Sequence, residues 1–430
     1  MQDVSEGRSL QEKAFKRLPT YQEGFHNDLL CDGMPYAPFG KTGLDVSLLG
    51  LGGSELALVY GTPDEDDGIQ TVIEGIKSGI NYVDTAPYYG QGKAEIVLGK
   101  ALKHIPRHTY YLATKVARYG ATPQDMFDFS YSRTLKSVDE SLERLGVDYI
   151  DILQVHDVEF AKDTDIIVNE TLPALQKIKE MGKIKFIGIT GYSLTRLKDV
   201  LEKSTVHIDV VLSYCRCALF DNSLKEYISF FKEKNLAIIN AAALGMGLLT
   251  EGGPPDWHPA RSEMKETCKQ AAEYCKERNV NIAKLAACYS FSQPDINVHL
   301  IGMQSKKLLE ANLRSLKEGL SSHENNVKEE ILTKYFKKLS VTHWENREVN
   351  QYWEDLKTLN QQCQMTPELA LPSPNFCITP VGGHLTLNNA RPTYMADLWL
   401  NWVLNLEPSS SKAKTLPIGS RGLQYHGSWT

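Results

Sequence analysis

The sequence has no long hydrophobic run. No stretch approaches the ~20 consecutive apolar residues that cross a bilayer, and the longest late run, 398–406, is interrupted by Asn401 and Asn405. The first residues, MQDVSEGRSLQEK, lack the apolar core of a secretory signal. These absences argue against a membrane span and against secretion, and they predict a cytoplasmic protein.

A strong excess of one charge is also missing. The 430 residues include 47 Lys and Arg against 53 Asp and Glu, which gives a formal net charge of −6. Proteins that bind nucleic acid or an anionic membrane usually carry a basic patch. We therefore expect a small-molecule partner and no nucleic acid or membrane. The hydrophobic share of 42% is that of an ordinary globular protein and excludes a largely disordered chain.

Several chemical motifs are missing as well. The eight cysteines form no Cys-x-x-Cys pair, so in a chain without a signal peptide we expect reduced thiols. There is no Gly-x-Ser-x-Gly elbow, no Walker loop and no His-Glu-x-x-His. A metal site built from His156 and Asp157 with His207 or His258 would combine distant elements, and we expect no metal.

Short β-rich runs alternate with helical patterns from about residue 45 to 320, and eight such units predict parallel strands joined by helices. An open doubly wound sheet is the alternative, but its phosphate-binding turn is only partly matched by GLGLGGS after Val46. The predicted fold is a (β/α)8 TIM barrel over 37–320, with an N-terminal tail, 1–36, and a C-terminal extension, 321–430. The eight candidate strands are VSLLGL from Val46, NYVDTA to Ala86, YYLATK to Lys115, YIDILQVH to His156, FIGITG to Gly191, VVLSY to Tyr214, LAIINAA to Ala242 and NVHLIGM to Met303.

The parts outside the repeat have their own patterns. The Pro- and Gly-rich stretch 250–264 predicts a long loop over the barrel mouth. The extension is expected to begin as a helix over 321–339 and to become irregular or disordered from Gln362. Within it, MADLWLNWVLNL (395–406) predicts a short amphipathic helix docked on the barrel or on a partner.

Four residues with useful chemistry fall at or near predicted strand ends: Asp84, Tyr89, Lys115 and His156. The carboxyl ends of barrel strands converge on one mouth, where active sites are built. Asp84 can hold Lys115 charged, and a neighbouring ammonium lowers the pKa of the Tyr89 phenol. His156 can orient a substrate oxygen. The set suits proton transfer at an oxygen during hydride transfer at carbon.

Taken singly, each of these residues has an ordinary structural interpretation. An Asp-Thr-Ala turn, a strand-end histidine with a hydrogen-bond partner, and a lysine that extends to solvent are all common. The hypothesis of a catalytic site depends on their joint occurrence, in order, on the second, third and fourth strands.

With these residues in view, the sequence resembles the aldo-keto reductases from about Phe39 to Leu320. The matching segments are FGKTGLDVSLLGLGG, NYVDTAPYYGQGKAEIVLGKAL, YYLATKV, SLERLGVDYIDILQVHD, ALQKIKEMGKIKFIGITGYS, LGMGLLTEGGPPDWHPA and IGMQSKKLLEANL. Among these segments, LGMGLLTEGGPPDWHPA most resembles the L-galactose dehydrogenase branch of the family. The resemblance implies an oxidoreductase in which Tyr89 is the general acid or base, beside Asp84, Lys115 and His156. It implies oxidation of an L-galactose-like aldose to its lactone, or interconversion of a carbonyl and an alcohol.

The resemblance also implies a nicotinamide cofactor across the mouth. The expected cofactor-binding positions are Gly53, Thr190, Gly191, Ser213, Leu244, Gly247, Met303 and Asn312. Several depart from the family pattern: Thr190-Gly191 replaces Ser-Asn, Ser213 replaces Gln, and Ala241 replaces an aromatic residue. Leu308 stands where members that read the adenosine 2′-phosphate have a basic residue, although Lys306 and Lys307 are close. We therefore favour NAD over NADP.

The extension leaves a second hypothesis open. Simple members of the family end near the last barrel helix, whereas this chain continues for about 100 residues. It resembles in this respect a cofactor-holding regulatory subunit, like the β subunits of potassium channels, with little turnover of its own.

Overall fold

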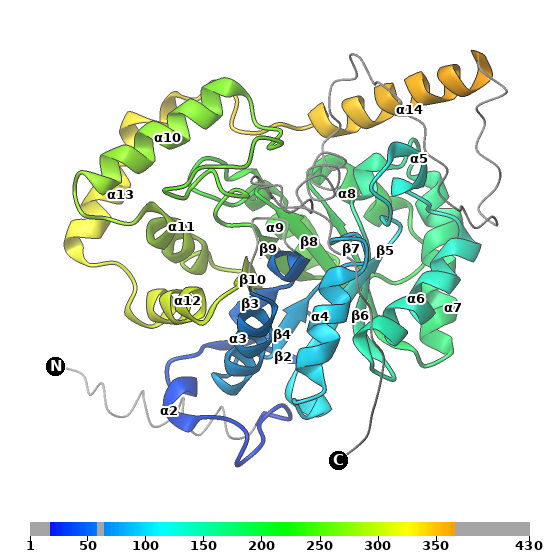
Figure 1. Ribbon diagram of the computed structural model, residues 1–430, viewed down its shortest axis with the longest axis horizontal. Coiled ribbons are helices and arrows are strands. Elements are labelled where there is room, and N and C mark those ends of the chain that lie inside the picture. Colours follow the sequence, from blue (N-terminus) through cyan, green and yellow to red (C-terminus); the bar gives the residue numbers. More distant parts are fainter. Residues whose placement is uncertain (1–17, 58–63, 366–430) are drawn as a thin grey trace, which may run out of the picture. The chain divides into compact units, whose positions relative to one another are not determined.

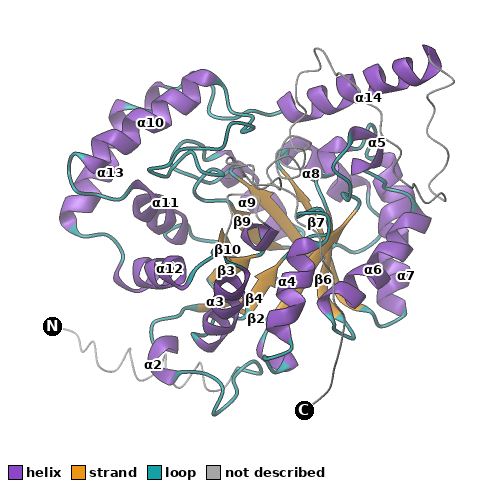
Figure 2. Ribbon diagram, in the orientation of Figure 1, coloured by secondary structure: helices purple, strands orange, loops and turns teal. Residues whose placement is uncertain are grey.

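Eight parallel strands close into a barrel in the computed structural model, which describes residues 18–57 and 64–365 (Figures 1 and 2). The strands follow one another around the barrel in chain order, and β10 pairs with β3 to close it. The predicted (β/α)8 barrel is confirmed, and the open doubly wound sheet is wrong. The barrel strands are β3 (Leu49–Gly52), β4 (Tyr82–Asp84), β5 (Tyr111–Val116), β6 (Ile150–Val155), β7 (Ile184–Gly191), β8 (Val210–Tyr214), β9 (Ala237–Ala241) and β10 (Val298–Gly302).

The first predicted strand is divided in two. β2 (Asp45–Ser47) pairs with β1 (Tyr36–Pro38) as an antiparallel hairpin, and only β3 enters the barrel. The hairpin turn carries Phe39, whose side chain is fully buried and lies 5.4 Å from the Tyr82 ring. Gly40 follows with a φ of +57°, and a Cβ there would lie 2.6 Å from the Ala237 nitrogen. The hairpin therefore plugs the amino-terminal end of the barrel, opposite the mouth.

Helices surround the strands, and those next to the sheet bury an apolar face against it. In α3, the residues spaced by three and four, Val72, Ile73 and Ile76, are buried as their periodicity predicts. The helices are α2 (Asp28–Cys31), α3 (Glu65–Lys77), α4 (Lys93–Leu102), α5 (Pro123–Met126), α6 (Tyr131–Leu145), α7 (Leu172–Glu180), α8 (Leu194–Lys203), α9 (Ile228–Glu233), α10 (Ser262–Lys276), α11 (Ile282–Phe291), α12 (Lys306–Glu318), α13 (Ser322–Lys334) and α14 (Arg347–Met365).

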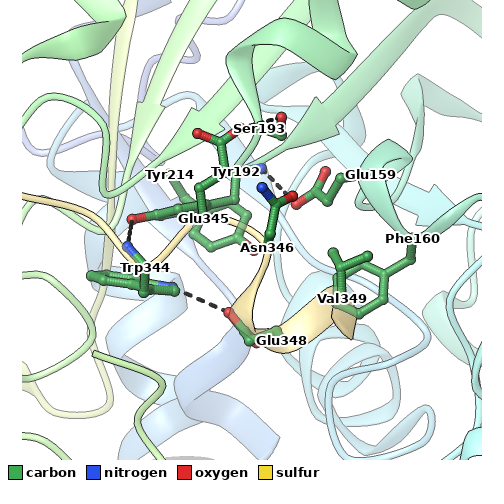
Figure 3. A pocket seen from close by; sticks show the side chains of 10 residues that line it. All are labelled: Glu159, Phe160, Tyr192, Ser193, Tyr214, Trp344, Glu345, Asn346, Glu348 and Val349. Atoms are coloured by element: carbon green, nitrogen blue, oxygen red, sulfur yellow. Dashed lines mark hydrogen bonds between the residues drawn. The ribbon is translucent and has the colours of Figure 1, made fainter. Parts of the chain in front are cut away.

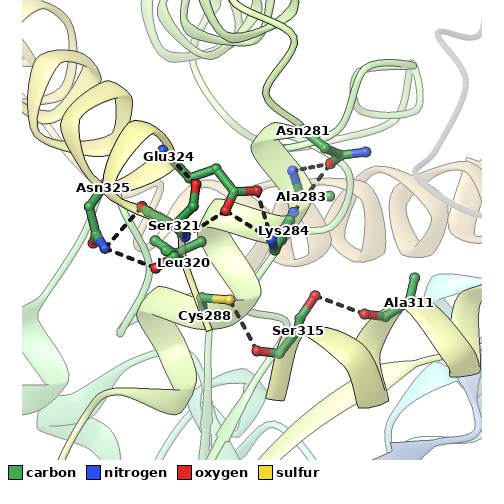
Figure 4. Close-up of polar contacts among 10 residues, drawn as sticks. All are labelled: Asn281, Ala283, Lys284, Cys288, Ala311, Ser315, Leu320, Ser321, Glu324 and Asn325. Atoms are coloured by element: carbon green, nitrogen blue, oxygen red, sulfur yellow. Dashed lines mark hydrogen bonds and ion pairs between the residues drawn. The ribbon is translucent and has the colours of Figure 1, made fainter. Parts of the chain in front are cut away.

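The first helix of the predicted extension, α13, is tied to the barrel by polar contacts (Figure 4). Ser321 and Glu324 form a reciprocal capping box at its start. The Glu324 carboxylate also accepts from Lys284 Nζ on α11 at 2.7 Å. A single glutamate therefore both begins α13 and anchors it.

The helix α14 is a feature that the sequence interpretation missed. It ends at Met365, so the expectation of irregular structure from Gln362 onward is wrong for residues 362–365. The predicted amphipathic helix at 395–406 lies outside the described residues. Within the described part of the chain, no helix is long and apolar enough to cross a bilayer.

A buried histidine on β10 gives the fold a predicted pH dependence. His299 has no exposed surface, and burial lowers its pKa to about 3. The imidazole of the unfolded chain titrates near pH 6.5, so protons favour unfolding as the pH falls from about 6.5 toward 3. Between pH 6.5 and 5 this residue is expected to remove about 2 kcal/mol from the free energy of unfolding.

The measurement is urea unfolding of the wild type and of His299→Gln at pH 6.5 and 5. The other described histidines with a lowered pKa are His26, His156 and His258, and they are present in both proteins as a common background. The variant should lose less stability on acidification than the wild type. Equal losses in the two proteins would contradict the assignment.

Candidate active site

Four side chains from three neighbouring strands meet at the barrel mouth. Asp84 ends β4, Lys115 lies on β5, His156 follows β6, and Tyr89 lies in the loop after β4. The Lys115 ammonium forms a close ion pair with Asp84 and donates to the Thr85 carbonyl at 2.8 Å. It also lies 3.4 Å from the Tyr89 hydroxyl. The predicted set of four is therefore one connected cluster.

The ion pair at the centre of this cluster is withdrawn from water. Lys115 is 2% exposed and Asp84 is 1% exposed. Gln154 Nε2 donates to the second oxygen of Asp84 at 2.7 Å, so both carboxylate oxygens have partners. Burial lowers the pKa of Lys115, but Asp84 and Tyr89 raise it by more. Lys115 is therefore a cation at neutral pH.

The pKa of the Tyr89 phenol differs from the prediction. Burial raises its pKa above the ordinary value of 10, and Lys115 lowers it by a smaller amount. The expectation that the ammonium would lower the pKa overall is wrong, because sequence spacing does not report desolvation. Tyr89 is thus a protonated phenol at neutral pH, with a cation beside its oxygen.

His156 completes the cluster as a neutral imidazole. It is 5% exposed, and burial, with Lys115 and Arg118 adding to it, holds its pKa well below 6.5. Its ring meets the Tyr89 ring edge to face, with centroids 5.7 Å apart. Nδ1 has no hydrogen-bond partner among the described residues, and Nε2 lies 3.6 Å from Asp157 Oδ2. A neutral imidazole of this kind can hydrogen-bond an uncharged substrate oxygen.

A second buried ion pair, which the sequence interpretation missed, borders the cluster. Arg118 donates to Asp157 at 2.5 Å, and its guanidinium stacks 3.8 Å from the centroid of the Tyr88 ring. Both partners are less than a tenth exposed. The sequence does offer a clue to this pair, because Arg118 lies three residues after Lys115 and Asp157 directly follows His156.

The expected cofactor positions fall into three groups. Gly53, Thr190, Gly191, Ser213 and Met303 lie at or just beyond strand ends and are buried. Leu244 and Gly247 lie in the loop after β9, and Asn312 lies on α12. The first group borders the mouth. The Asn312 amide donates to the Leu308 carbonyl of its own helix at 2.9 Å.

The residues at this edge of the mouth fit a dinucleotide. A Cβ at Gly53 would lie 3.0 Å from the Asp84 carbonyl, so this position beside the cluster leaves no space for a side chain. Ser213 Oγ and Gln304 Oε1 are buried and lack hydrogen-bond partners among the residues described. α12 begins directly after this edge and points its amino terminus toward it, which favours phosphate groups.

The C-terminal segment also reaches the mouth. Trp344 is 2% exposed and stacks on Tyr192 with ring centroids 4.7 Å apart. Its backbone nitrogen donates to the Tyr192 hydroxyl at 3.1 Å. Tyr192 directly follows β7, so residues far along the chain cover a strand end of the barrel. Sequence spacing gives no signal for such a long-range contact.

Comparison with known proteins agrees with this arrangement. The chain is 47% identical over 282 residues to an L-galactose dehydrogenase of Arabidopsis thaliana, covering 65% of this chain and 87% of that protein. It is 35% identical to a D-arabinose 1-dehydrogenase of Saccharomyces cerevisiae, covering 70% and 93%. Among solved structures, aldo-keto reductase AKR11C1 from Bacillus halodurans is similar with a TM-score of 0.55 and 26% identity, covering 69% of this chain and 96% of that one.

The family model described as the aldo/keto reductase family matches residues 48–332. This range contains all eight barrel strands and all four residues of the cluster. The eight-stranded barrel, the cluster at its mouth and the relatives agree with one another. The chain belongs to the aldo/keto reductase family of oxidoreductases.

Proposed function

We propose that the protein is an NAD(P)-dependent aldose dehydrogenase that oxidises a sugar of the L-galactose kind to its lactone. The observation that carries this proposal is the Tyr89 hydroxyl beside the buried Lys115–Asp84 pair, with neutral His156 against the Tyr89 ring. The names of two relatives, L-galactose dehydrogenase and D-arabinose 1-dehydrogenase, support a sugar as the substrate.

The cluster would handle the proton of this reaction. A nicotinamide bound at the mouth would supply the acceptor for the hydride that leaves C1 of the sugar. Tyr89, as phenolate, takes the proton of the anomeric hydroxyl, and the cation of Lys115 stabilises the phenolate. His156 donates a hydrogen bond to the same substrate oxygen and fixes its direction. In the reverse reaction, the Tyr89 phenol returns the proton to that oxygen.

NAD is the favoured cofactor. Leu308, on the first turn of α12, has no charge to offer an adenosine 2′-phosphate, and its side chain is 41% exposed. Lys306 and Lys307 are exposed on the same turn, but they lack the bidentate fork of arginine. NADP would therefore gain less from this helix than in an enzyme with arginine there.

The proposal is tested by steady-state kinetics of the full chain with NAD and with NADP against a panel of aldoses and simple carbonyls. We expect turnover with L-galactose or a related aldose and a higher kcat/KM with NAD. Absence of turnover across the panel would overturn the proposal. Tight cofactor binding without turnover would instead favour a regulatory subunit.

A further inference from the structure

A buried ion pair lies against the histidine of the cluster. Asp157 directly follows His156 in the chain, and its Oδ2 lies 3.6 Å from His156 Nε2. The same oxygen accepts from Arg118 Nη1 at 2.5 Å. The distance to His156 is too long for a hydrogen bond, so Asp157 acts on the imidazole through its charge. Arg118 is therefore placed where it neutralises the carboxylate that faces His156.

The backbone of Asp157 is fixed at the end of β6. Its φ is +53°, in the left-handed region that residues with a side chain seldom adopt. Its N–H donates to the Thr190 hydroxyl on β7 at 3.1 Å. Two strand ends thus hold the carboxylate in this position, and backbone strain that is maintained by its surroundings is common at functional sites.

Aromatic rings enclose Arg118 on its other sides. Its guanidinium carbon lies 3.8 Å from the centroid of the Tyr88 ring and 5.2 Å from the centroids of Phe127 and Phe160. The Arg118 side chain is 8% exposed. Rings at these distances attract the guanidinium and exclude water, and this strengthens its interaction with Asp157.

The C-terminal extension completes this enclosure. Tyr352 of α14 is buried and packs edge to face on Phe127 and Phe160, with ring centroids 5.3 and 5.6 Å away. Val349, on the first turn of α14, and Phe160 line the same small hollow (Figure 3). Both α14 residues lie beyond residue 332, where the family match ends. A part of the chain outside the family range therefore shields the ion pair from water.

The surrounding charges make the protonation of His156 sensitive to Arg118. Burial lowers the pKa of His156, and the charges of Lys115 and Arg118 lower it further. Burial raises the pKa of Asp157, and Arg118 lowers it by a smaller amount. Without Arg118, Asp157 and His156 would together hold a proton more strongly and would titrate as a pair. Lys115 does not replace Arg118, because its ammonium is already paired with Asp84.

Other titratable groups interact electrostatically with Arg118 and Asp157 from neighbouring elements. They are Tyr88 and Tyr89 after β4, Lys115 on β5, Glu159 after β6, Tyr214 at the end of β8 and Glu348 on α14. Burial raises the pKa of the three tyrosines and of Glu159, which favours their uncharged forms. All six are retained in the variants of Arg118 and Asp157 used below, so they form a common background.

We infer that Arg118 is a positioning residue for His156. By holding Asp157 in an ion pair, Arg118 keeps the carboxylate from drawing a proton onto the imidazole, which then meets the substrate oxygen uncharged. A protonated ring would donate to Asp157 in a charge-assisted hydrogen bond and turn away from the substrate. Tyr352 supports Arg118 by closing the aromatic enclosure. The inference rests on the proposed function, in which His156 fixes the direction of the substrate oxygen.

The first test follows the protonation of His156 directly. Full-length protein labelled with ¹⁵N-histidine is titrated by NMR from about pH 5 to 8, and the His156 ring signals are identified by their absence in His156→Gln. In the wild type the imidazole should remain uncharged over this range. In Arg118→Met its titration should move into this range, because Asp157 has lost its partner. Arg118→Gln keeps a hydrogen-bond donor for Asp157 and should show the same shift if the methionine variant fails to fold.

Two further variants separate the effect of charge from a loss of stability. Arg118→Met combined with Asp157→Asn removes both charges, so the His156 titration should return to low pH. Arg144→Met breaks a different buried pair, since Arg144 on α6 donates to the fully buried Glu95 on α4 at 2.6 Å. This control should lower the unfolding temperature, as Arg118→Met does, but leave the His156 titration unchanged.

The second test is the rate of sugar oxidation. At about pH 7, Arg118→Met should lower kcat/KM for L-galactose by about tenfold, the value of one hydrogen bond to the substrate oxygen. The loss should diminish toward about pH 9, as the shared proton leaves His156 and Asp157. Arg118→Lys retains the cation and should recover most of the activity. Tyr352→Ala should give a smaller loss of the same kind, whereas Tyr352→Phe keeps the ring and should resemble the wild type.

The outcomes separate the inference from the proposed function. A wild type without turnover of any sugar would overturn the proposed function, and the His156 titration would still decide whether Arg118 controls the imidazole. Identical His156 titrations in the wild type and in the Arg118 variants without a cation would overturn the inference, even if the enzyme oxidises L-galactose. Unchanged kinetics and titration in Tyr352→Ala would overturn the part assigned to α14.

Discussion

Replacing Tyr89 by phenylalanine is expected to lower kcat by about 10²–10⁴-fold, the usual contribution of a positioned general acid or base. The substitution removes one oxygen and leaves the ring that packs against His156. Lys115 and Asp84 keep their ion pair and the Thr85 contact, so the fold should be little affected. The measurement is kcat with the best aldose of the panel, together with cofactor affinity from quenching of protein fluorescence.

Cofactor affinity is the internal control for this variant. It should remain within a few-fold of the wild type, because Tyr89 acts on the substrate proton. Tyr88→Phe is the matched control, since Tyr88 is the adjacent tyrosine and its ring stacks on Arg118 rather than contacting Lys115. If Tyr89→Phe retained most of its kcat, Tyr89 would not be the proton-transfer group.

The pH dependence follows from the same phenol. Burial raises the pKa of Tyr89, so the phenolate needed for oxidation becomes more abundant as the pH increases above neutrality. The rate of sugar oxidation should therefore rise with pH, and the rate of carbonyl reduction should fall on approaching the Tyr89 pKa. A rate of oxidation that declined from pH 7 to 9 in a stable enzyme would contradict this assignment.

Much of this barrel was predictable because its signals are local. Alternation of strand and helix patterns predicts a parallel barrel, and the geometry of that fold brings the ends of adjacent strands together. Asp84, Lys115 and His156 could therefore be grouped from their places at the ends of successive strands. The division of the first run into β2 and β3 was missed because VSLLGL has no glycine or proline between Ser47 and Leu49 to mark where one strand ends and the next begins.

What escaped prediction depends on contacts between distant residues or on desolvation. Trp344 meets Tyr192 across 152 positions of sequence, and neither residue has a local pattern that predicts the contact. Glu159 looks like an ordinary loop glutamate until the structure shows it buried beside Gly191. The pKa of Tyr89 is raised rather than lowered for the same reason. The sequence indicates which charges are near the phenol but not how much water is excluded from it.

Replacing Lys115 by methionine is expected to abolish turnover and also to destabilise the protein. The methionine fills similar volume but leaves the Asp84 carboxylate, 1% exposed, with Gln154 as its remaining side-chain donor. Breaking a buried ion pair by removing one partner costs about 3–5 kcal/mol. Loss of the cation beside Tyr89 also removes the group that stabilises its phenolate, so kcat should fall at least as far as in Tyr89→Phe.

The two effects are separated by measuring unfolding in urea and kcat on the same preparation. Lys177→Met is the matched control for stability, because Lys177 pairs with Glu180 at 3.9 Å with both side chains more than half exposed. Such surface pairs contribute about 0–1 kcal/mol, so this variant should resemble the wild type in both measurements. If Lys115→Met were as stable as Lys177→Met, the Asp84 carboxylate would have to take up a proton when its partner is lost. In that case Lys115→Met should lose stability as the pH rises, since ionisation of Asp84 then favours the unfolded chain.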